Sequence, residues 1–257
     1  MNDPWSAKAR FSSLIVLTAA VVLSAGVGAA PLEPEIRAQV VAADRAMIGA
    51  GMSGRLDDVF FRDGEDFKTE DILVSFQCDV QKAHEKRAFA ILQKQLKVAE
   101  INERLRQIGS LSVKQIFEIE AQVMEARAEH EVAEALLKRC EIIAPFSGRV
   151  SDVVVKRYEH VNEGQAIIEI YNPSTLEVEA IVPSSWITWL KQGYAFTVFV
   201  DELKRSYNAR ALIPSGKVDP VSQSLKVRGR IEKPDNDLLP GMSGRIVITL
   251  PEDQQNK

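Results

Sequence analysis

Two stretches of the chain carry the same pattern of hydrophobic and polar positions. Residues 53–76 and 147–170 align without a gap at a constant offset of 94 residues. Short apolar runs broken by Gly and acidic turn residues predict β-strands in both stretches. The matched apolar positions are Leu56 with Val150, Phe60 with Val154, Phe67 with Val161, Leu73 with Ile167, Val74 with Ile168 and Phe76 with Ile170. We expect two copies of one β unit that pack face to face as a small sandwich.

The residues between the two copies change to a helical pattern. Ile91, Val98 and Leu105 recur every seven residues on a first arm, with Ile101 and Ile108 in the intermediate positions. The second arm has a 3–4 spacing of mostly apolar residues: Ile116, Ile119, Val123, Ala126, His130, Ala133, Leu137 and Cys140. The pattern predicts an antiparallel coiled-coil hairpin over residues 78–140 that turns at 109–112.

Folding the arms about this turn gives specific expectations for the hairpin. It would bring Leu105 near Ile116, Val98 near Val123 and Ile91 near His130. The first arm is mostly basic and the second mostly acidic, which we expect to favour pairing of the two arms, although exposed ion pairs are individually weak.

A third β-rich region follows residue 172. Strand candidates at 176–182, 197–200, 209–213, 225–231 and 245–250 are separated by Pro and Gly. This spacing predicts a small antiparallel β-barrel over 173–250, to which residues 35–50 add a strand. The expected fold class is α+β and mainly β, with a short tail at 251–257.

Composition and the N-terminal residues narrow the possible classes. The chain has 257 residues, 46% of them hydrophobic and 26% charged, with a net charge of −4. This charge gives no basis for nucleic-acid binding. Lys8 and Arg10 precede an apolar run at 11–23 and small residues at 24–30, a layout that predicts a secretory signal or an N-terminal anchor over 1–29.

Few residues are suited to chemistry. Cys78 and Cys140 lie at the two ends of the predicted hairpin, where they either form a disulfide at its base or remain as two buried thiols. The three histidines are scattered, and we find no metal-ligand spacing, no catalytic set and no phosphate loop. We therefore expect neither an enzyme nor a bound cofactor.

Four segments carry a resemblance to a known family: 144–150 (APFSGRV), 161–165 (VNEGQ), 218–224 (VDPVSQS) and 239–244 (LPGMSG). Their order, with the hairpin between the β copies, resembles the membrane-fusion or periplasmic adaptor family, which serves RND (resistance-nodulation-division) pumps, ABC exporters and haemolysin-type secretion systems. The resemblance implies a lipoyl-like barrel-sandwich hybrid (51–77 plus 141–172), split by the hairpin (78–140) and followed by a β-barrel (35–50 plus 173–250).

The resemblance also implies a function. An adaptor lies in the periplasm beside the inner membrane, links an inner-membrane RND or ABC transporter to an outer-membrane efflux duct, and associates with copies of itself, in a ring. The duct would meet the hairpin tip, whose residues here are Leu105, Ile108, Gly109, Ser110, Leu111 and Ser112. Leu105 and Ser112 keep the spacing of the family's tip pattern, and Ile101 stands where that pattern has Arg.

Two other functions stay open. The chain could be a stand-alone binding or structural module of the cell envelope. It could also be a lipoyl or biotin carrier domain, although a helical insertion occupies the junction where such domains present their modified lysine.

Overall fold

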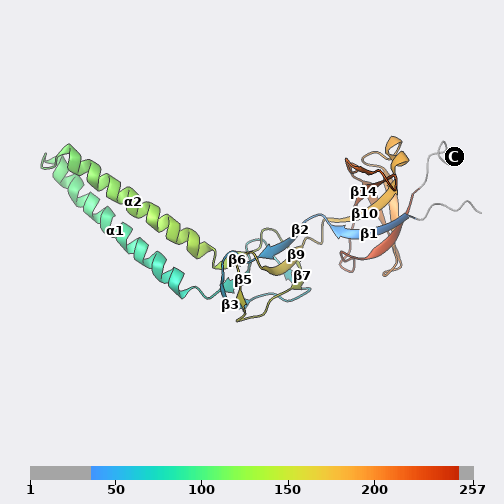
Figure 1. The fold of residues 1–257 in the computed structure, drawn as a ribbon, viewed down its shortest axis with the longest axis horizontal. Coiled ribbons are helices and arrows are strands. Elements are labelled where there is room, and N and C mark those ends of the chain that lie inside the picture. The colour runs from blue at the N-terminus through green and yellow to red at the C-terminus, as the bar shows by residue number, and fades with distance from the viewer. Residues whose placement is uncertain (1–35, 249–257) are drawn as a thin grey trace, which may run out of the picture. The chain divides into compact units, whose positions relative to one another are not determined.

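The computed structural model describes residues 36–248, which include two duplicated β units joined by a pair of helices (Figure 1). The units form two four-stranded sheets, ordered β2-β9-β7-β4 and β6-β5-β3-β8. Their strands are β2 (Arg45–Gly49), β3 (Gly54–Val59), β4 (Asp66–Phe67), β5 (Ile72–Phe76), β6 (Glu141–Ile143), β7 (Gly148–Val153), β8 (His160–Val161) and β9 (Ala166–Tyr171). Strands β3, β4 and β5 begin 94 residues before β7, β8 and β9, so the predicted repeat is confirmed.

The two copies exchange their short strands. Strand β4 of the first copy pairs with β7 of the second, and β8 of the second pairs with β3 of the first. Each sheet therefore contains strands of both copies, and neither copy would complete a sheet alone. This exchange explains why the repeat folds as one sandwich.

Burial follows the repeat position by position. Leu56 and Val150 are 0% and 1% exposed, and the other matched pairs are buried with them in one core, apart from one pair. That pair, Phe60 and Val154, is exposed, at 52% for each residue. The repeat thus conserves an exposed apolar position as well as the core.

The turns are repeated too. The Glu65 and Glu159 carboxylates each accept a hydrogen bond from the backbone N–H three residues earlier, at 2.9 and 2.8 Å. The residue before each glutamate, Gly64 or Tyr158, has a positive φ of 82° or 68°. Asx-like turns of this kind hold a left-handed residue in place, which any residue but Gly adopts at a cost.

The helices α1 (Asp79–Gln107) and α2 (Val113–Lys138) follow β5 and precede β6 in the chain, and they pack against each other. The face predicted for α2 is right, because all eight of its residues are buried or partly buried. The face predicted for α1 is wrong at four of its five positions: Ile91, Ile101, Leu105 and Ile108 are exposed at 38–72%, whereas Val98 is half-buried. Helix α1 buries Ala88 and Leu92. Small residues on both helices allow a close approach that the large side chains of the heptad stripe would prevent.

The alignment of the two helices also differs from the expected one. The His130 ring lies 3.1 Å from the Glu85 carboxylate and 5.4 Å from the Phe89 ring, so its partners are six and two residues before the expected partner Ile91. The basic and acidic arms do not pair as expected either. Among residues 36–248, each ion pair that a helical Lys or Arg forms lies within its own helix, and the ion pairs between the helices are His84–Glu129 and His130–Glu85.

The last part of the chain forms a closed six-stranded antiparallel barrel, in the order β10-β1-β15-β11-β12-β14 and back to β10. A short strand, β13 (Val218–Asp219), adds to β14. The barrel strands are β1 (Ile36–Ala42), β10 (Leu176–Pro183), β11 (Ala195–Val200), β12 (Arg205–Ala211), β14 (Ser224–Ile231) and β15 (Ser243–Val247). A 3-10 helix, η1 (Ser184–Thr188), buries Trp186 in the barrel core.

One boundary needs correction. Residues 35–50 were expected to belong to the barrel, but only β1 does so; β2 pairs with β9 in the sandwich. The change falls at Asp44, whose carboxylate accepts a hydrogen bond from the Thr175 hydroxyl at 2.9 Å. This bond joins the two segments that connect the barrel with the sandwich. The chain passes from one to the other at Asp44, so the barrel ends before residue 45.

Candidate partner-binding site

The turn between α1 and α2 brings the predicted tip residues together. Helix α1 ends at Gln107, and Gly109 has a φ of 72°, which lets the Ser110 N–H bond back to the Leu105 carbonyl at 3.0 Å. A left-handed glycine after the last turn is a common helix ending. The tip is therefore a defined loop between two helix ends.

The second helix begins with a capping box. The Ser112 hydroxyl accepts the Gln115 N–H at 3.3 Å, and the Gln115 side chain accepts the Ser112 N–H at 2.9 Å. This reciprocal pair satisfies two backbone donors of the first turn. Ser112 thus has a structural role, and Ile108 and Leu105 are the tip residues that expose apolar surface, at 72% and 38%.

Two further exposed residues adjoin the tip and were missed by the sequence prediction. Val113 and Phe117 are 68% and 65% exposed in the first turns of α2. The sequence does indicate them in one way: both are large apolar residues at the start of α2 that fall outside the 3–4 spacing of its predicted buried face. The tip surface is defined here as Leu105, Ile108, Val113 and Phe117.

Charges near the tip are neutralised locally. Arg106 donates to the Glu103 carboxylate at 2.7 Å, and this hydrogen bond lowers the pKa of Glu103 below its ordinary value. The Glu100 carboxylate lies 2.7 Å from Lys97 and 3.0 Å from Arg104. The pKa of Glu100 is lowered, and the hydrogen bond from Lys97 is the largest cause. Local pairing of this kind leaves the tip surface mainly apolar, as a protein-binding surface is at its centre.

A groove of about 360 Å³ runs between the helices just behind the tip. Leu96, Ala99 and Asn102 line it from α1, and Ile116 and Ile119 from α2. Glu100, Glu103, Arg106 and Glu120 also line the groove, so charged side chains stand beside its apolar ones. The groove gives the tip a concave surface of mixed apolar and charged side chains, which suits a helix end or a loop of a partner.

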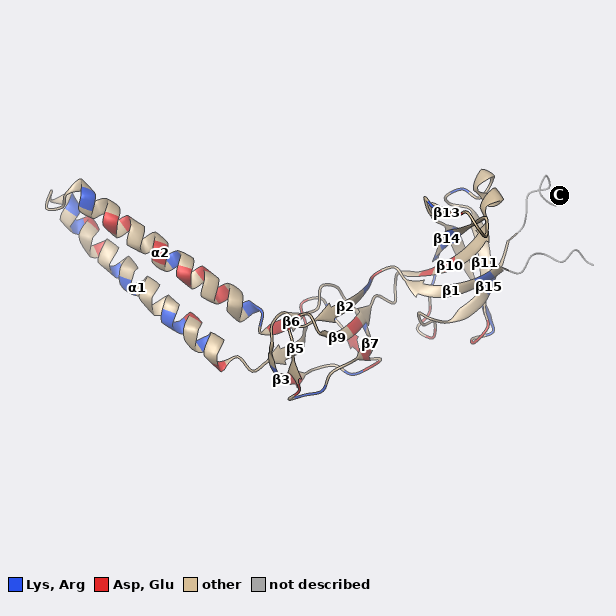
Figure 2. Ribbon diagram, in the orientation of Figure 1, with Lys and Arg blue, Asp and Glu red and all other residues tan. Residues whose placement is uncertain are grey.

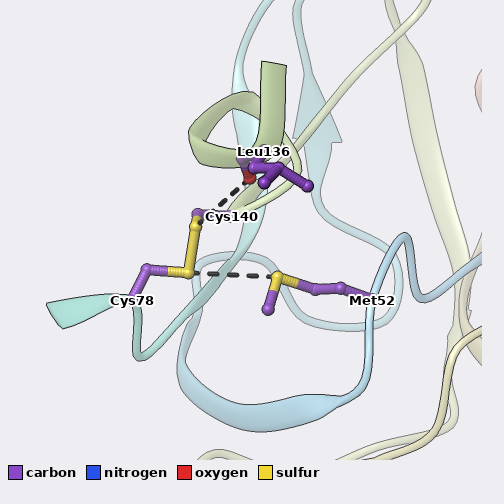
Figure 3. Close-up of a disulfide and its surroundings, with 4 residues drawn as sticks. All are labelled: Met52, Cys78, Leu136 and Cys140. Atoms are coloured by element: carbon purple, nitrogen blue, oxygen red, sulfur yellow. Dashed lines mark hydrogen bonds between the residues drawn. A yellow bond between two sulfur atoms is a disulfide. The ribbon is translucent and has the colours of Figure 1, made fainter. Parts of the chain in front are cut away.

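The base of the helical pair carries the two cysteines. Their sulfurs are bonded, with the Cα atoms 6.1 Å apart and 62 residues of separation (Figure 3). The Cys78 sulfur lies 4.0 Å from the Met52 sulfur, and the Cys140 sulfur lies 3.9 Å from the Leu136 carbonyl oxygen. Bonded sulfurs carry no hydrogen, so both contacts are van der Waals contacts. The bridge joins the N-cap residue of α1 to Cys140, which lies two residues after the end of α2.

The residues 36–248 contain no group of three or more His, Cys, Asp or Glu side chains that could hold a metal ion. His84 and His130 each face a glutamate of the other helix, and His160 is exposed in β8. Within the same range, no helix is both long enough and apolar enough to span a membrane. The expected signal or anchor at 1–29 and the tail at 251–257 lie outside the described residues.

The chain has a distant relative in sequence. No protein-family model matches the chain. An uncharacterised protein of Haemophilus influenzae is 24% identical over 213 residues, which cover 80% of this chain and 54% of that protein. The chain therefore spans about half the length of this relative.

Solved structures give a firmer result. A MacA–MexA chimera that contains the α-hairpin domain of Pseudomonas aeruginosa MexA has a TM-score of 0.75 at 20% identity, over 82% of this chain and 79% of the chimera. The membrane fusion protein Spr0693 of Streptococcus pneumoniae has a TM-score of 0.69 at 15% identity, over 84% and 98% of the two chains. MacA of Actinobacillus actinomycetemcomitans has 0.56 at 19% identity, over 83% and 78%. The chain has the fold of the membrane-fusion, or periplasmic adaptor, proteins.

Proposed function

We propose that this protein is the periplasmic adaptor subunit of an efflux or secretion system. In this role it links an inner-membrane transporter of the RND or ABC class to an outer-membrane duct. The shared fold supports the general role. We also propose that the duplicated sandwich is a lipoyl-like domain and that the helical pair is a coiled-coil hairpin.

The observation that carries the proposal is the tip surface. Four apolar side chains are exposed around a turn that is fixed at both helix ends, and the neighbouring charges are paired. Exposed apolar groups on a rigid support are typical of a docking site. We propose that the tip packs against the helix ends of the duct, as a helix packs into a groove.

The sandwich and the barrel have a different role. We propose that the sandwich and barrel rest on the transporter and that copies of the chain stand side by side. A single copy cannot enclose a channel, whereas repeated head-to-tail contacts close into a ring.

Export to the periplasm accounts for two further features. The basic residues and apolar run at 1–29 would direct export or hold the chain at the inner membrane. Disulfides persist in the periplasm and are rare in the cytosol, so a bond between Cys78 and Cys140 suits that compartment.

The proposal is tested by capture of the tip's partner. Ser110→Cys places a thiol in the turn, and a thiol-reactive photocrosslinker attached there traps neighbours in cells that contain the whole system. Val221→Cys is the matched control, because Val221 is 93% exposed on the barrel. We expect the tip to trap an outer-membrane protein that the barrel position does not trap. Capture of lipid alone, or of the same proteins from both positions, would contradict duct docking.

A further inference from the structure

The six-stranded barrel is connected with the sandwich at one of its two ends. The segments 43–44 and 172–175, which follow β1 and precede β10, form this connection. Strands β1 and β10 are antiparallel, and Ala42 pairs with Leu176 at this end. Ile36, which begins β1, therefore lies at the opposite end, which is named here the free end of the barrel.

Two connections between strands lie at the free end. The last residue of β10 pairs there with the first residue of β14. The connection 184–194, which includes η1, follows β10, and the connection 212–223, which includes β13, precedes β14. The Ser184 N–H donates to the Gln223 carbonyl at 2.8 Å, so the two connections lie side by side.

Large apolar side chains are exposed on both connections. Ile187 is 47% exposed on the first connection. Ile213, Val218 and Val221 are 72%, 43% and 93% exposed on the second. The 3-10 helix that carries Ile187 also buries Trp186 in the barrel core, which fixes this connection to the barrel. Exposed apolar groups on a fixed support are typical of a surface that contacts a partner.

Positive charge accompanies the apolar residues of the free end. The two connections contain Lys191, Lys217 and one acidic residue, Asp219. The Asp219 carboxylate is held within its own turn, because it accepts hydrogen bonds from the Val221 and Ser222 N–H groups at 3.0 and 2.9 Å. Two lysines and one aspartate give the connections of the free end a net charge of +1.

The end that is connected with the sandwich has a different composition. Its segments 43–44, 172–175, 201–204 and 232–242 hold six acidic residues and two lysines, a net charge of −4 (Figure 2). Within these four segments, Leu239 is the one large apolar residue that is exposed, at 41%. Apolar exposure and charge thus both distinguish the free end from the other end of the same barrel.

We infer that the free end lies on the phospholipid surface of the inner membrane. Ile187, Ile213 and Val221 enter the boundary between headgroups and acyl chains, and Lys191 and Lys217 lie beside lipid phosphates. Apolar side chains flanked by lysines are the composition that binds this boundary of an anionic membrane. This inference rests on the inner-membrane location in the proposed function and adds a lipid-binding surface to it. The wall of the barrel stays available for the transporter.

The position of the N-terminal segment supports a lipid rather than a protein partner. The sequence predicts a signal or an anchor over 1–29, and the chain that follows it enters the barrel at the free end through Ile36. From residue 23, where the apolar run ends, to Ile36 the chain spans at most about 45 Å. As an anchor, this segment would hold the free end, and not the acidic end, near the bilayer.

The test places a fluorophore at either end of the barrel in the full-length chain. The two cysteines of the sequence are bonded to each other, so an introduced thiol is the free one. Val221→Cys and its matched control, Leu239→Cys, are labelled with an environment-sensitive nitrobenzoxadiazole dye. Each chain is reconstituted without a transporter in vesicles of phosphatidylethanolamine and phosphatidylglycerol, in which part of the lipid carries a doxyl quencher high in its acyl chain.

The two positions should differ in quenching. We expect the emission at 221 to fall by at least about half and the emission at 239 by less than about a tenth, because interfacial groups lie about 5–10 Å inside the headgroup boundary. Ile213→Asp combined with Lys217→Glu should reduce the quenching at 221 at least about fivefold, because the apolar contact and the attraction to phosphate are both lost. Lys233→Glu at the acidic end is the control that should leave this quenching unchanged.

Three results would overturn the inference: absence of quenching at 221, equal quenching at 221 and 239, or quenching at 221 that the double substitution leaves unchanged. The proposed function fails separately, when the tip position 110 traps no duct. Capture of the duct at 110 without quenching at 221 would contradict only the lipid contact.

Discussion

Removing the disulfide is a direct test of how the helical pair is held at its base. Cys78→Ala combined with Cys140→Ala deletes the bridge without adding a buried hydroxyl, which would need a hydrogen-bond partner. Both cysteines are buried, at 1% and 4% exposed, and belong to the sandwich core. The substitution therefore acts on the junction between the sandwich and the helices.

The expected loss follows from the size of the closed loop. The bridge spans a sequence separation of 62 residues, and the chain-entropy model assigns such a loop about 4 kcal/mol of stabilisation. For a urea m-value of about 2 kcal/mol per M, the unfolding midpoint should fall by roughly 2 M. The midpoint is read from circular dichroism at 222 nm, which reports α1 and α2.

Reduction of the unaltered protein is the matched control, and it should reproduce the shift. A shift smaller than about 0.5 M in both experiments would refute the reasoning, because it would mean that the bridge constrains little of the unfolded chain.

Three other predictions concern the repeat, the tip and one ion pair. Gly148→Ala should cost about 1–3 kcal/mol in urea unfolding, because its Cβ would lie 2.2 Å from the Tyr171 carbonyl oxygen, whereas the equivalent Gly54→Ala should be nearly neutral since its Cβ has a nearest neighbour at 3.5 Å. Ser112→Ala should cost about 1 kcal/mol of helix stability by thermal unfolding, with Ser110→Ala as the neutral control. Arg149 lowers the pKa of Asp66 by a hydrogen bond, so Asp66→Asn should lower stability by less than about 1 kcal/mol at pH 7. That difference should shrink as the pH falls below about 4 through the lowered pKa, and a difference that does not shrink with falling pH would contradict the assignment.

The duplicated sandwich was predictable because its signal is long and redundant. The constant offset fixes the strands, the core and the turns together, and pairs such as Leu73 and Ile167 are both fully buried. A single strand carries no such check. The strand at 45–49 illustrates this, because its alternation fits the barrel and the sandwich equally well, and only pairing with β9 assigns it to the sandwich.

The helical pair shows a second limit of sequence patterns. Helix α1 has two stripes, one with Ala88 and Leu92 and one with Ile91 and Val98, and hydrophobicity favours the second. The structure buries the first, because small residues permit closer helix packing. Periodicity identifies an apolar face of a helix, but it does not identify what packs against that face.

The candidate site was predictable in part. The turn at Gly109 and the capping box at Ser112 and Gln115 follow known sequence signals. The exposure of Val113 and Phe117 depends on which face of α2 meets α1. Which residues form the tip surface thus depends on how α1 and α2 pack, and the sequence alone does not determine this packing.

In the proposed function, one molecule binds partners in both membranes through separate surfaces. The most direct measurement is affinity purification of the tagged chain from detergent extracts, with quantitative mass spectrometry, before and after Ile108→Asp at the tip. Ile108 is 72% exposed, so the change should leave the fold intact. We predict that the unaltered chain brings down an inner-membrane transporter and an outer-membrane duct, and that Ile108→Asp loses the duct while it keeps the transporter. Recovery of neither partner with the unaltered chain, or equal recovery of both with the variant, would contradict the claim.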